Sequence, residues 1–581
     1  MLSSLLFIVP LIHLLAAPHT KVEESFNMQA THDLLVYGTP TSGIRDRLAT
    51  TYDHMTFPGV VPRTFVGAVL LSGVSQPIIA VTGFRHAQMV VRAVLGAFNA
   101  ACLLVMKTSL SRAFGVGVGR WWTVLMVCQF HIMFYLSRTL PNMFAFGLTT
   151  LSFSFILPTN DKASSRRTQQ AIVLMTMAAA VFRAELAILL ASLGGYLVLV
   201  GRADPRALAP VVLGALALSL AISVPIDSYF WQRPVWPELS AFYFNAVQGS
   251  SSEWGVSPWH WYFSSALPRL LMNPLSPPLI GFALWHPATS RPARLLCVPS
   301  LLFVAVYSAQ PHKEARFVFY VVPPLTAAAA LGANLLSSRA PRSLPSRLAA
   351  AAAGLVAPLC LAASAAMLLV SALNYPGGDA LSQLRALVAS DVALVASTSP
   401  HPDVKVKMPP HILTHADVLT CMTGLTLFGQ NPLGLPLALY AATADDPDVD
   451  ARMLVDPSIA PLLLFDRTEH DGTLGWPHYW SRLGYALEED PDLPIGAWDV
   501  VGVIQAFAGI EFLRPGEEAA GILSEPDRSQ SQDEYGEHNI LGLGARVAEV
   551  RQWVRKRTGG WWVGPRMAPR IRLMRRYHQT T

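Results

Sequence analysis

Residues 207–226 read ALAPVVLGALALSLAISVPI and carry no charged side chain. Roughly 20 apolar residues are what an α-helix needs to cross the hydrocarbon core of a bilayer, so this stretch predicts a membrane span. Other predominantly apolar stretches, some of them shorter, predict further spans. They lie at residues 2–18, 65–82, 88–106, 121–137, 143–158, 170–184, 186–201, 274–286, 295–309, 317–336 and 348–373. The sequence therefore predicts an α-helical polytopic membrane protein with about twelve spans.

The composition supports this interpretation and divides the chain in two. Hydrophobic residues make up 52% of the 581 residues and charged residues only 14%, whereas a soluble globular chain carries about 25% charged residues. A cytosolic enzyme, a nucleic-acid-binding protein and a disordered scaffold are thereby excluded. Residues 1–374 carry 25 Lys and Arg but only 12 Asp and Glu, and residues 375–581 carry 18 and 26. We therefore predict a membrane domain at residues 1–375 and a soluble domain at residues 376–581.

The soluble part alternates apolar stretches with turn signals, which predicts an α/β or α+β domain. We expect strands at residues 391–398, 462–466, 498–504 and 570–573, a short helix at residues 481–490 and a loop at residues 524–536. A basic run extends from Arg551 to Arg576. Such a run is most often a solvated face, and contact with lipid headgroups or a diphosphate is the alternative.

The chain starts with a span that we expect to be retained, because residues 2–18 lack the basic start and cleavage pattern of a signal peptide. A long polar loop follows at residues 19–64, in which we expect one or two helices. Glu23 and Glu24 come directly after the span, where partial desolvation would suit a general base. The alternative is that both acids form a helix N-terminus that faces water. The acids and histidines of this loop match no compact ligand motif, so we predict no metal site.

A second polar cluster, QPHKEARF at residues 310–317, lies between two predicted spans. Three charged residues and a His within five positions are costly at membrane depth, and such residues usually mark function. Lys313 and Arg316 would suit a phosphate group. The structural alternative is an interfacial anchor with internal ion pairing.

Arg183 and Glu185 lie among apolar residues and are two positions apart. On an ideal helix they would point in different directions. We therefore expect each to find a partner on another helix or in water, in a buried structural network or in a substrate site.

Five motifs together carry a resemblance to a known family. They are KVEESFNMQATHD at residues 21–33, YDHMTFPGVVPRT at 52–64, SRTLPN at 137–142, FRAEL at 182–186 and HKEARF at 312–317. These motifs resemble those of the endoplasmic-reticulum mannosyltransferases that use dolichyl-phosphate-mannose. The resemblance extends over about residues 1–375. It is strongest to the branch that adds the eighth mannose, in α-1,6 linkage, to the dolichyl-diphosphate-linked oligosaccharide.

The resemblance implies a multi-pass glycosyltransferase of the GT-C type in the endoplasmic-reticulum membrane, with a luminal active site, a luminal loop at residues 19–64 and a luminal soluble domain. Its substrates would be dolichyl-phosphate-mannose as donor and a seven-mannose lipid-linked oligosaccharide as acceptor. The implied transfer converts a β-linked donor into an α-linked product and therefore inverts the anomeric carbon. It requires no cofactor and no metal, and no nucleic acid is expected as a partner.

The resemblance also implies roles for individual residues. Glu23 is the expected base, and Glu24 is the second candidate. The donor phosphate is expected at His312, Lys313, Arg316 and Arg138, and the acceptor at Asp53, His54 and Arg63.

Alternatives remain within the class and outside it. A sister α-1,2-mannosyltransferase of the same pathway, or a mannosyltransferase of glycosylphosphatidylinositol anchor assembly, would share the motifs. A polytopic lipid or sugar transporter would carry broken helices at corresponding positions of two halves. The acids instead gather in one early loop, and the sequence shows no internal repeat.

Overall fold

A computed structural model of the protein describes residues 2–158, 164–339, 344–398, 411–437, 462–469, 472–517 and 539–577. The chain forms two compact units. The first comprises Met1–Ala17, Phe26–Thr82 and His86–Leu368, and the second comprises Pro18–Ser25, Gly83–Arg85 and Leu369–Thr581. The division predicted from charge density lies a few residues beyond Leu369. Two short segments from the early chain also join the second unit.

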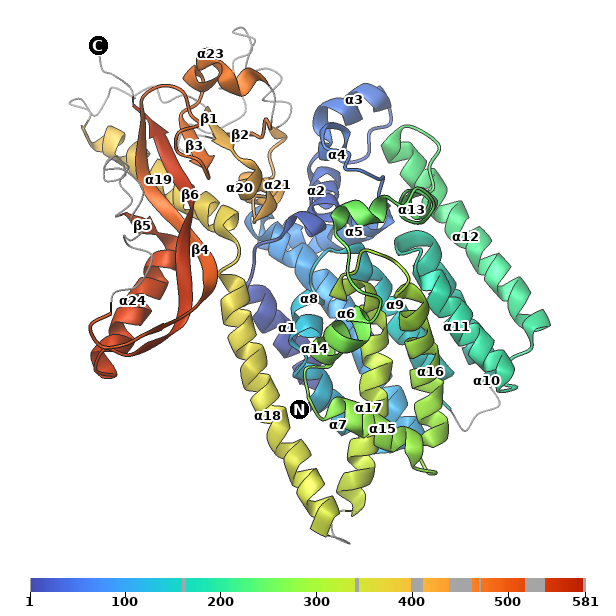
Figure 1. Ribbon diagram of the computed structural model, residues 1–581. Helices are drawn as coiled ribbons and strands as arrows, with labels where there is room; N and C mark the ends of the chain where they lie inside the picture. Colours follow the sequence, from blue (N-terminus) through green and yellow to red (C-terminus); the bar gives the residue numbers. More distant parts are fainter. Residues whose placement is uncertain are drawn as a thin grey trace. The chain divides into compact units, whose positions relative to one another are not determined.

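The first unit is helical (Figure 1). Its helices are α1 (Leu5–Ala16), α2 (Val22–Tyr37), α3 (Ile44–Thr51), α4 (Asp53–Thr56), α5 (Val66–Thr82), α6 (Ala87–Phe114), α7 (Val116–Val127), α8 (Phe130–Tyr135), α9 (Pro141–Ile156), α10 (Ser164–Met177), α11 (Leu186–Leu199), α12 (Pro205–Trp231), α13 (Pro237–Phe242), α14 (Leu267–Leu271), α15 (Ser276–Trp285), α16 (Ser290–Tyr307), α17 (Val322–Arg339) and α18 (Leu344–Ala372). A 3₁₀ segment, η7 (Ala315–Val321), leads into α17.

In the part of the chain that the structure describes, five helical segments are long and apolar enough to cross a membrane, by length and composition. They are Phe84–Phe114, Pro205–Trp231, Ser290–Tyr307, Ala315–Arg339 and Ala350–Ala372. The predicted helical membrane body is therefore confirmed. One predicted span is not continuous, because α7 ends at Val127 and Gln129 is extended before α8 begins. The buried Gln129 Nε2 donates to Thr326 Oγ1 at 2.8 Å, so this break lies against α17.

Small residues and polar side chains hold the helices together, as is usual where lipid removes the hydrophobic force between helices. Gly147 of α9 approaches α6 so closely that a Cβ at this position would overlap the Phe98 ring. Asn99 of α6 donates to the carbonyl of Leu136 at 2.9 Å. Asn27 of α2 donates to the carbonyl of Thr139 at 2.6 Å, which ties the polar loop to the start of α9.

The loop at residues 19–64 contains α2, α3 and α4, one helix more than we expected. Asp227 of α12 fixes the end of this loop, because its carboxylate accepts from Phe65 N at 2.7 Å and from Thr64 Oγ1 at 3.0 Å. These bonds satisfy a backbone donor at the start of α5 and give the buried carboxylate its partners. Aromatic packing of Phe65 against Phe230 and Trp231 completes the attachment.

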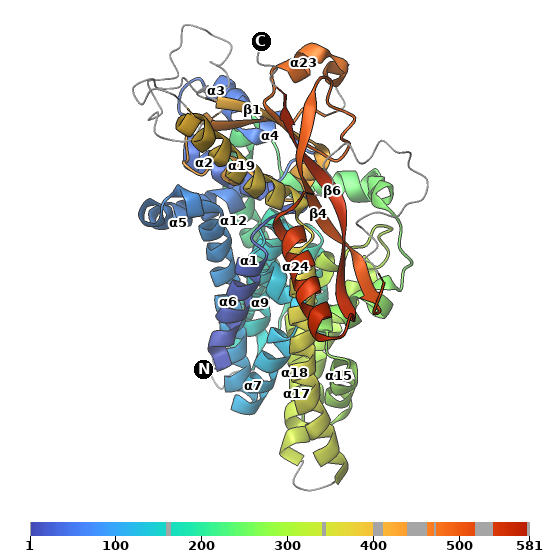
Figure 2. The ribbon, with the colours of Figure 1, turned by 90° about the vertical axis from the view of Figure 1, so that its left-hand side faces the viewer.

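The second unit is a mixed sheet with helices (Figure 2). Its strands, in the order β2-β1-β3-β6-β4-β5, are β1 (His411–Ala416), β2 (Leu462–Asp466), β3 (Tyr485–Glu488), β4 (Trp498–Leu513), β5 (Ile540–Leu541) and β6 (Trp562–Arg576). β1 runs parallel to β2 and β3, β5 runs parallel to β4, and β6 is antiparallel to both β3 and β4. Its helices are α19 (Pro376–Thr398), α20 (Val418–Met422), α21 (Leu427–Gln430), α23 (Pro477–Ser481) and α24 (Gly542–Arg557).

The strands predicted at residues 462–466, 498–504 and 570–573 are confirmed by β2, β4 and β6. The strand predicted at 391–398 is wrong, because α19 continues to Thr398. Ala380, Leu384 and Val388 of this helix pack on the sheet, and their helical spacing decides the structure against the strand preference of valine.

Two other expectations for this unit can be compared with the structure. The helix predicted at residues 481–490 is wrong, because α23 ends at Ser481 and Tyr485–Glu488 form a central strand in which every side chain is buried. The loop predicted at residues 524–536 lies outside the described residues.

Candidate active site

Arg183 and Glu185 bind each other directly, contrary to our expectation. Arg183 Nε lies 2.7 Å from Glu185 Oε1. The helical geometry on which we relied is broken here. A π-helical turn at Ala178–Phe182 follows α10, and Arg183 is extended, with φ −155° and ψ 102°. π-Helical turns are frequent at functional sites, and this one turns both side chains toward one another.

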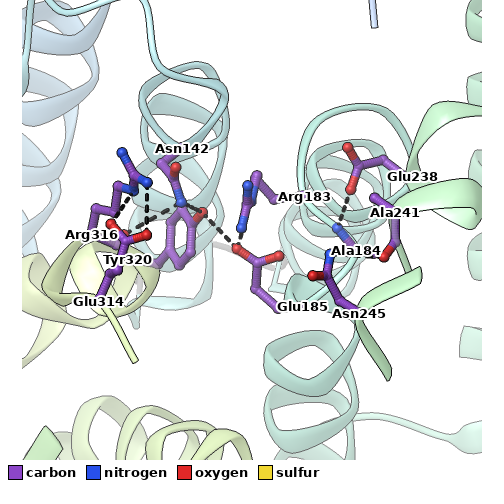
Figure 3. A network of polar contacts seen from close by, with 10 residues as sticks. All are labelled: Asn142, Arg183, Ala184, Glu185, Glu238, Ala241, Asn245, Glu314, Arg316 and Tyr320. Atoms are coloured by element: carbon purple, nitrogen blue, oxygen red, sulfur yellow. Dashed lines mark hydrogen bonds and ion pairs between the residues drawn. The ribbon is translucent and has the colours of Figure 1, made fainter. Parts of the chain in front are cut away.

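The ion pair belongs to a network that joins distant parts of the sequence (Figure 3). Tyr320 Oη of η7 donates to Glu185 Oε1 at 3.3 Å, and Asn142 Nδ2 of α9 donates to Tyr320 Oη at 2.8 Å. Asn142 comes from the SRTLPN motif and Arg183 from FRAEL, while Tyr320 lies shortly after HKEARF. Three motifs of the predicted family thus meet at one place.

Glu238 of α13 adds a second carboxylate. Its Oε2 accepts from the backbone N–H of Ala184 at 2.6 Å, between the two members of the ion pair. Burial raises the pKa of Glu238 to about 7, although the positive charges of Arg183 and Arg63 act in the opposite direction. The site therefore holds a carboxyl group that titrates near neutral pH. The sequence analysis did not single out Glu238. The feature that could have identified it is that residues 1–374 contain only 12 acids.

The HKEARF motif forms an internally paired turn. Arg316 Nε lies 2.7 Å from Glu314 Oε2, and Arg316 Nη2 donates to Glu314 Oε1 at 2.8 Å. His312 Nε2 lies 3.1 Å from the same carboxylate. The internal ion pairing that we gave as the structural alternative is therefore present. Asn142 Nδ2 also lies 3.4 Å from the carbonyl of Arg316, which links this turn to the network around Arg183.

Lys313 is directed toward backbone oxygens rather than toward Glu314. Its Nζ donates to the carbonyls of Ser257 at 3.0 Å and of Gln310 at 2.5 Å. The ammonium group is thereby held in place without a carboxylate neighbour among these contacts. Its charge is therefore not neutralised by the bonds that fix it.

The two acids predicted as bases lie in the first turn of α2, as the helix N-terminus alternative requires, but Glu24 does not face water as that alternative also requires. Glu24 is buried, and its Oε1 accepts from the backbone N–H of Lys21 at 3.2 Å. This bond resembles the return contact of a capping box, in which an acid inside the helix satisfies a donor that precedes it. Glu23 is half-buried. The choice of Glu23 as base stays a prediction.

The remaining predicted residues lie in different surroundings. Arg138 is buried, with its guanidinium carbon 4.0 Å from the Phe134 ring centroid. His54 is buried against Phe65 and Trp231. These contacts are typical of packing residues.

Asp53 and Arg63 lie at the two ends of the second loop motif. The backbone N–H of Asp53 donates to Asp33 Oδ2 at 2.8 Å, so its main chain joins the buried Asp33–His32 pair. Arg63 is exposed, and its charge reaches Glu238. Of the three residues predicted to bind the acceptor, Arg63 is thus linked electrostatically to the network around Arg183.

Potential metal ligands do not gather in the described part of the chain. Within residues 2–577, apart from the ranges that the structure leaves out, no group of three or more His, Cys, Asp or Glu side chains is arranged to hold a metal ion. The candidate site combines carboxylates with Arg, Tyr and Asn, which are suited to bind a polar substrate and to stabilise negative charge.

Comparisons with known proteins agree with these motifs. The Alg9-like mannosyltransferase family matches residues 3–387. A Drosophila melanogaster protein named Dol-P-Man:Man(7)GlcNAc(2)-PP-Dol alpha-1,6-mannosyltransferase is 38% identical over 391 residues, 66% of this chain and 55% of its own length. The match thus spans little more than half of the fly relative. A Saccharomyces cerevisiae protein of the same name is 33% identical over 546 residues, 88% of either chain.

A solved structure extends the likeness to the fold. The crystal structure of ArnT from Cupriavidus metallidurans bound to undecaprenyl phosphate matches with a TM-score of 0.51 and 13% identity, over 86% of this chain and 95% of ArnT. At this identity the match concerns the fold alone, and it agrees with the predicted GT-C architecture. Because the family match over residues 3–387 includes all five motifs, the chain belongs to the Alg9-like mannosyltransferase family.

Proposed function

We propose that this protein transfers mannose from dolichyl-phosphate-mannose, in α-1,6 linkage, to a seven-mannose dolichyl-diphosphate-linked oligosaccharide. The observation that carries the proposal is the likeness to the yeast α-1,6-mannosyltransferase over 88% of either chain. The multi-pass body and the family match support a membrane-bound glycosyltransferase. We place the protein in the endoplasmic-reticulum membrane with its active site in the lumen.

The proposed chemistry is a single inverting displacement. The oxygen of the acceptor 6-hydroxyl forms a bond to C1 of the mannose, while the bond from C1 to the phosphate oxygen breaks. The hydroxyl proton goes to a carboxylate, and dolichyl phosphate leaves with the electron pair. A base and a cationic phosphate site are therefore the two requirements for the protein.

Glu23 is the proposed base. It lies one residue from Glu24, whose bond to the Lys21 N–H already gives that carboxylate a capping role. Glu23 is half-buried, whereas Glu24 is buried.

Arg316 is the central residue of the proposed phosphate site, with His312, Lys313 and Arg138 as further contributors. About a fifth of the Arg316 side chain is exposed. Glu314 holds the guanidinium in a fixed orientation, and the N–H groups on its accessible part could bind a phosphate oxygen. Asn142 couples this residue to Tyr320, and through it to Glu185.

The network around Arg183 serves as the positioning element of the site in this proposal. Glu238 holds the backbone of Ala184, and Arg183 holds Glu185. The acceptor is proposed to approach Arg63, whose charge reaches the same group of residues, together with Asp53 and His54 of the preceding loop.

The test is transfer by the purified full-length protein from dolichyl-phosphate-mannose to the seven-mannose lipid-linked acceptor, followed by linkage mapping. We expect a new α-1,6-linked mannose. An α-1,2 linkage would instead favour a sister enzyme of the same family. Failure of a folded protein to use any mannosylated lipid acceptor would contradict the proposal, and lipid translocation would then be measured.

The base is tested in the same assay with Glu23→Gln, which keeps the size of the side chain and removes its proton-accepting charge. Removal of a general base lowers the rate roughly 10²- to 10⁴-fold. Glu549→Gln is the matched control, because Glu549 is an exposed glutamate of the same unit as Glu23, and the activity of this variant should equal that of the wild type. If Glu24→Gln loses activity while Glu23→Gln keeps it, the base is Glu24.

A further inference from the structure

The far ends of β4 and β6 form a two-stranded antiparallel ribbon, called the hairpin below although β5 and α24 lie between the two strands in the chain, and the ribbon has two unlike faces. On one face, Trp562 Nε1 donates to Glu511 Oε1 at 3.0 Å, and Arg551 of α24 binds the same carboxylate at 3.1 Å. This face is covered by α24, which lies along the hairpin (Figure 1). Side chains alternate between the faces of a strand, so the neighbours of Glu511 and Trp562 point away from α24.

These neighbours are large and apolar, and they are exposed. Phe512 pairs with Val563 across the strands, and Ile510 pairs with Pro565. The exposed fractions are 62% for Ile510, 56% for Phe512 and 63% for Val563. Trp561 lies beside them, with its ring centroid 5.5 Å from that of Phe512. We call Ile510, Phe512, Trp561 and Val563 the hairpin face. Exposed apolar patches of this kind usually mark an interaction surface.

Positive charge is abundant in the segment of the chain that contains Trp561 and Val563, with half of the basic residues on α24. Residues 542–576 carry ten Lys and Arg and a single acid, Glu549. Arg566 is an exposed residue of β6 that pairs with Gly509, so its side chain starts from the side of Glu511 at the edge of the two strands. Its Nη2 donates to the carbonyl of Ala508 at 2.7 Å. Aromatic and basic side chains together are typical of segments that lie in the headgroup region of a bilayer. A second copy of the same basic hairpin would instead meet like charge.

The second unit also contains a contact that limits how far the hairpin face lies from a membrane span. The apolar segment Ala350–Ala372 of α18 ends one residue before Leu373. The carbonyl of Leu373 accepts from Phe507 N of β4 at 3.2 Å. Phe512 lies five positions after Phe507, and this length of strand spans at most about 17 Å. The hairpin face is therefore tethered within a short distance of the end of a span.

We propose that the hairpin face lies in the headgroup region of the bilayer, in the leaflet at which α18 ends, and that anionic headgroups are its binding partner. Phe512, Val563 and Trp561 contact the boundary of the hydrocarbon layer. Arg566 binds lipid phosphate. This membrane contact goes beyond the proposed transfer reaction and does not depend on it.

The test uses the full-length protein in nanodiscs of phosphatidylcholine and phosphatidylserine. Phe512→Cys and Val563→Cys are labelled with an environment-sensitive fluorophore. The wild-type protein, treated with the same label, measures the background fluorescence from the native cysteines. Trp476→Cys, an exposed position of the same unit in the segment that leads into α23, is the control. We expect spin-labelled lipid to remove most of the fluorescence at 512 and 563 and little at 476. Aqueous iodide should give the opposite pattern.

Two outcomes would overturn the proposal. Quenching at 512 and 563 by iodide alone would mean that the hairpin face is solvated. Protection from both quenchers would mean that protein covers it, either a second copy or another segment of the chain. The charge contribution is tested by adding Arg566→Glu to Phe512→Cys, which should reduce lipid quenching in anionic nanodiscs and change it much less in pure phosphatidylcholine.

Discussion

Two buried polar clusters, one in each unit, hold their acids in different ways. In the first unit, Arg183 pairs with Glu185 and opposes the rise in the pKa of Glu238, which reaches about 7. In the second unit, His415 Nε2 lies 3.3 Å from Glu488 Oε1. Burial raises the pKa of Glu488 to about 9, and the nearby acids Asp417 and Asp490 raise it further. The neighbouring Arg183 thus helps to keep the pKa of Glu238 near neutrality. Glu488, in contrast, stays protonated at neutral pH.

The cluster in the second unit is a line of close polar contacts from Glu488 to Asp466. Burial lowers the pKa of His415 to about 4. A protonated Glu488 can donate to Nε2 of the neutral ring, whose Nδ1 lies 2.9 Å from Tyr479 Oη. Tyr479 donates to Asp466 at 2.7 Å. This arrangement places a single negative charge, on Asp466, at the end of the cluster, which suits a structural role. The network around Arg183 holds more charge and is partly exposed, so it can respond to a substrate.

The sharpest test of this comparison is Arg183→Ala, for which we expect the largest effect. The substitution removes the positive charge beside Glu185 and Glu238 and releases the turn that follows α10. Loss of a charged group from a preorganised site lowers turnover by about 10²- to 10³-fold. Transfer kinetics measure the loss, and Arg183→Lys should recover part of it. Unchanged activity in the alanine variant would show that the network is not part of the active site.

A smaller effect is expected for Tyr320→Phe. This change removes the hydroxyl that links Asn142 to Glu185 and leaves the ring in place. A lost hydrogen bond to a charged group is worth about 1.5–3 kcal/mol, so kcat/KM should fall roughly 10- to 100-fold. Tyr196→Phe is the control, because this half-buried tyrosine of α11 lies eleven positions after Glu185 along the chain. Equal losses in both variants would point to packing rather than to the hydrogen bond.

Glu238→Gln should change the pH dependence of activity more than its maximum. The wild-type carboxyl, with a pKa of about 7, becomes charged as the pH rises through neutrality and then binds Ala184 N–H and faces Arg183 most strongly. Activity should therefore rise between about pH 6 and 8, by a few-fold. The variant cannot titrate and should lose this rise. A profile that keeps its inflection near pH 7 in Glu238→Gln would assign the titration to another group.

The least effect on activity is expected for Glu488→Gln, which should alter only the pH dependence of stability. Between pH 4.5 and about 9, folded Glu488 keeps a proton that the unfolded chain releases, so its contribution to stability falls as pH rises. His415 acts oppositely between about pH 4 and 6.5, where only the unfolded chain binds its proton. The net fall should therefore appear above pH 6.5.

Thermal unfolding of the full-length protein between pH 6.5 and 9 measures this fall, which should amount to a few degrees in the wild type. Glu488→Gln should remove most of it, because the amide can still donate to His415 but does not titrate. The neighbouring exposed Glu489→Gln should behave as the wild type. A steeper fall in the Gln variant than in the wild type would contradict the assignment.

The two units also differ in how far their structure could be predicted. In the membrane part, charged side chains are so costly that each one marks a place of interest, and the FRAEL and HKEARF motifs could be singled out. What could not be predicted was the direct pairing of Arg183 with Glu185, because a π-helical turn changes the helical period locally. Glu238 lay outside every recognised motif, and only folding brings it to Ala184.

In the soluble part, charged residues are common and carry no such signal. His415 and Glu488 lie in strands 73 positions apart in the numbering and could not be paired without the sheet register. Residues 391–398 illustrate the other difficulty. Their valines favour a strand, but the packing of the preceding turns of α19 on the sheet keeps the segment helical. Tertiary packing thus outweighed local preference.

The bonds from Asp227 to Thr64 and Phe65 have a consequence for the order in which the protein can assemble during synthesis. The carboxylate lies 162 residues after the Phe65 N–H that it binds. At roughly 5–20 residues per second, a ribosome needs about 10–30 s to reach it. During that interval the start of α5 lacks its partner, so the early loop reaches its final structure only after α12 has been made. A chain that stops before residue 227 would contain four of the five motifs and would lack this attachment.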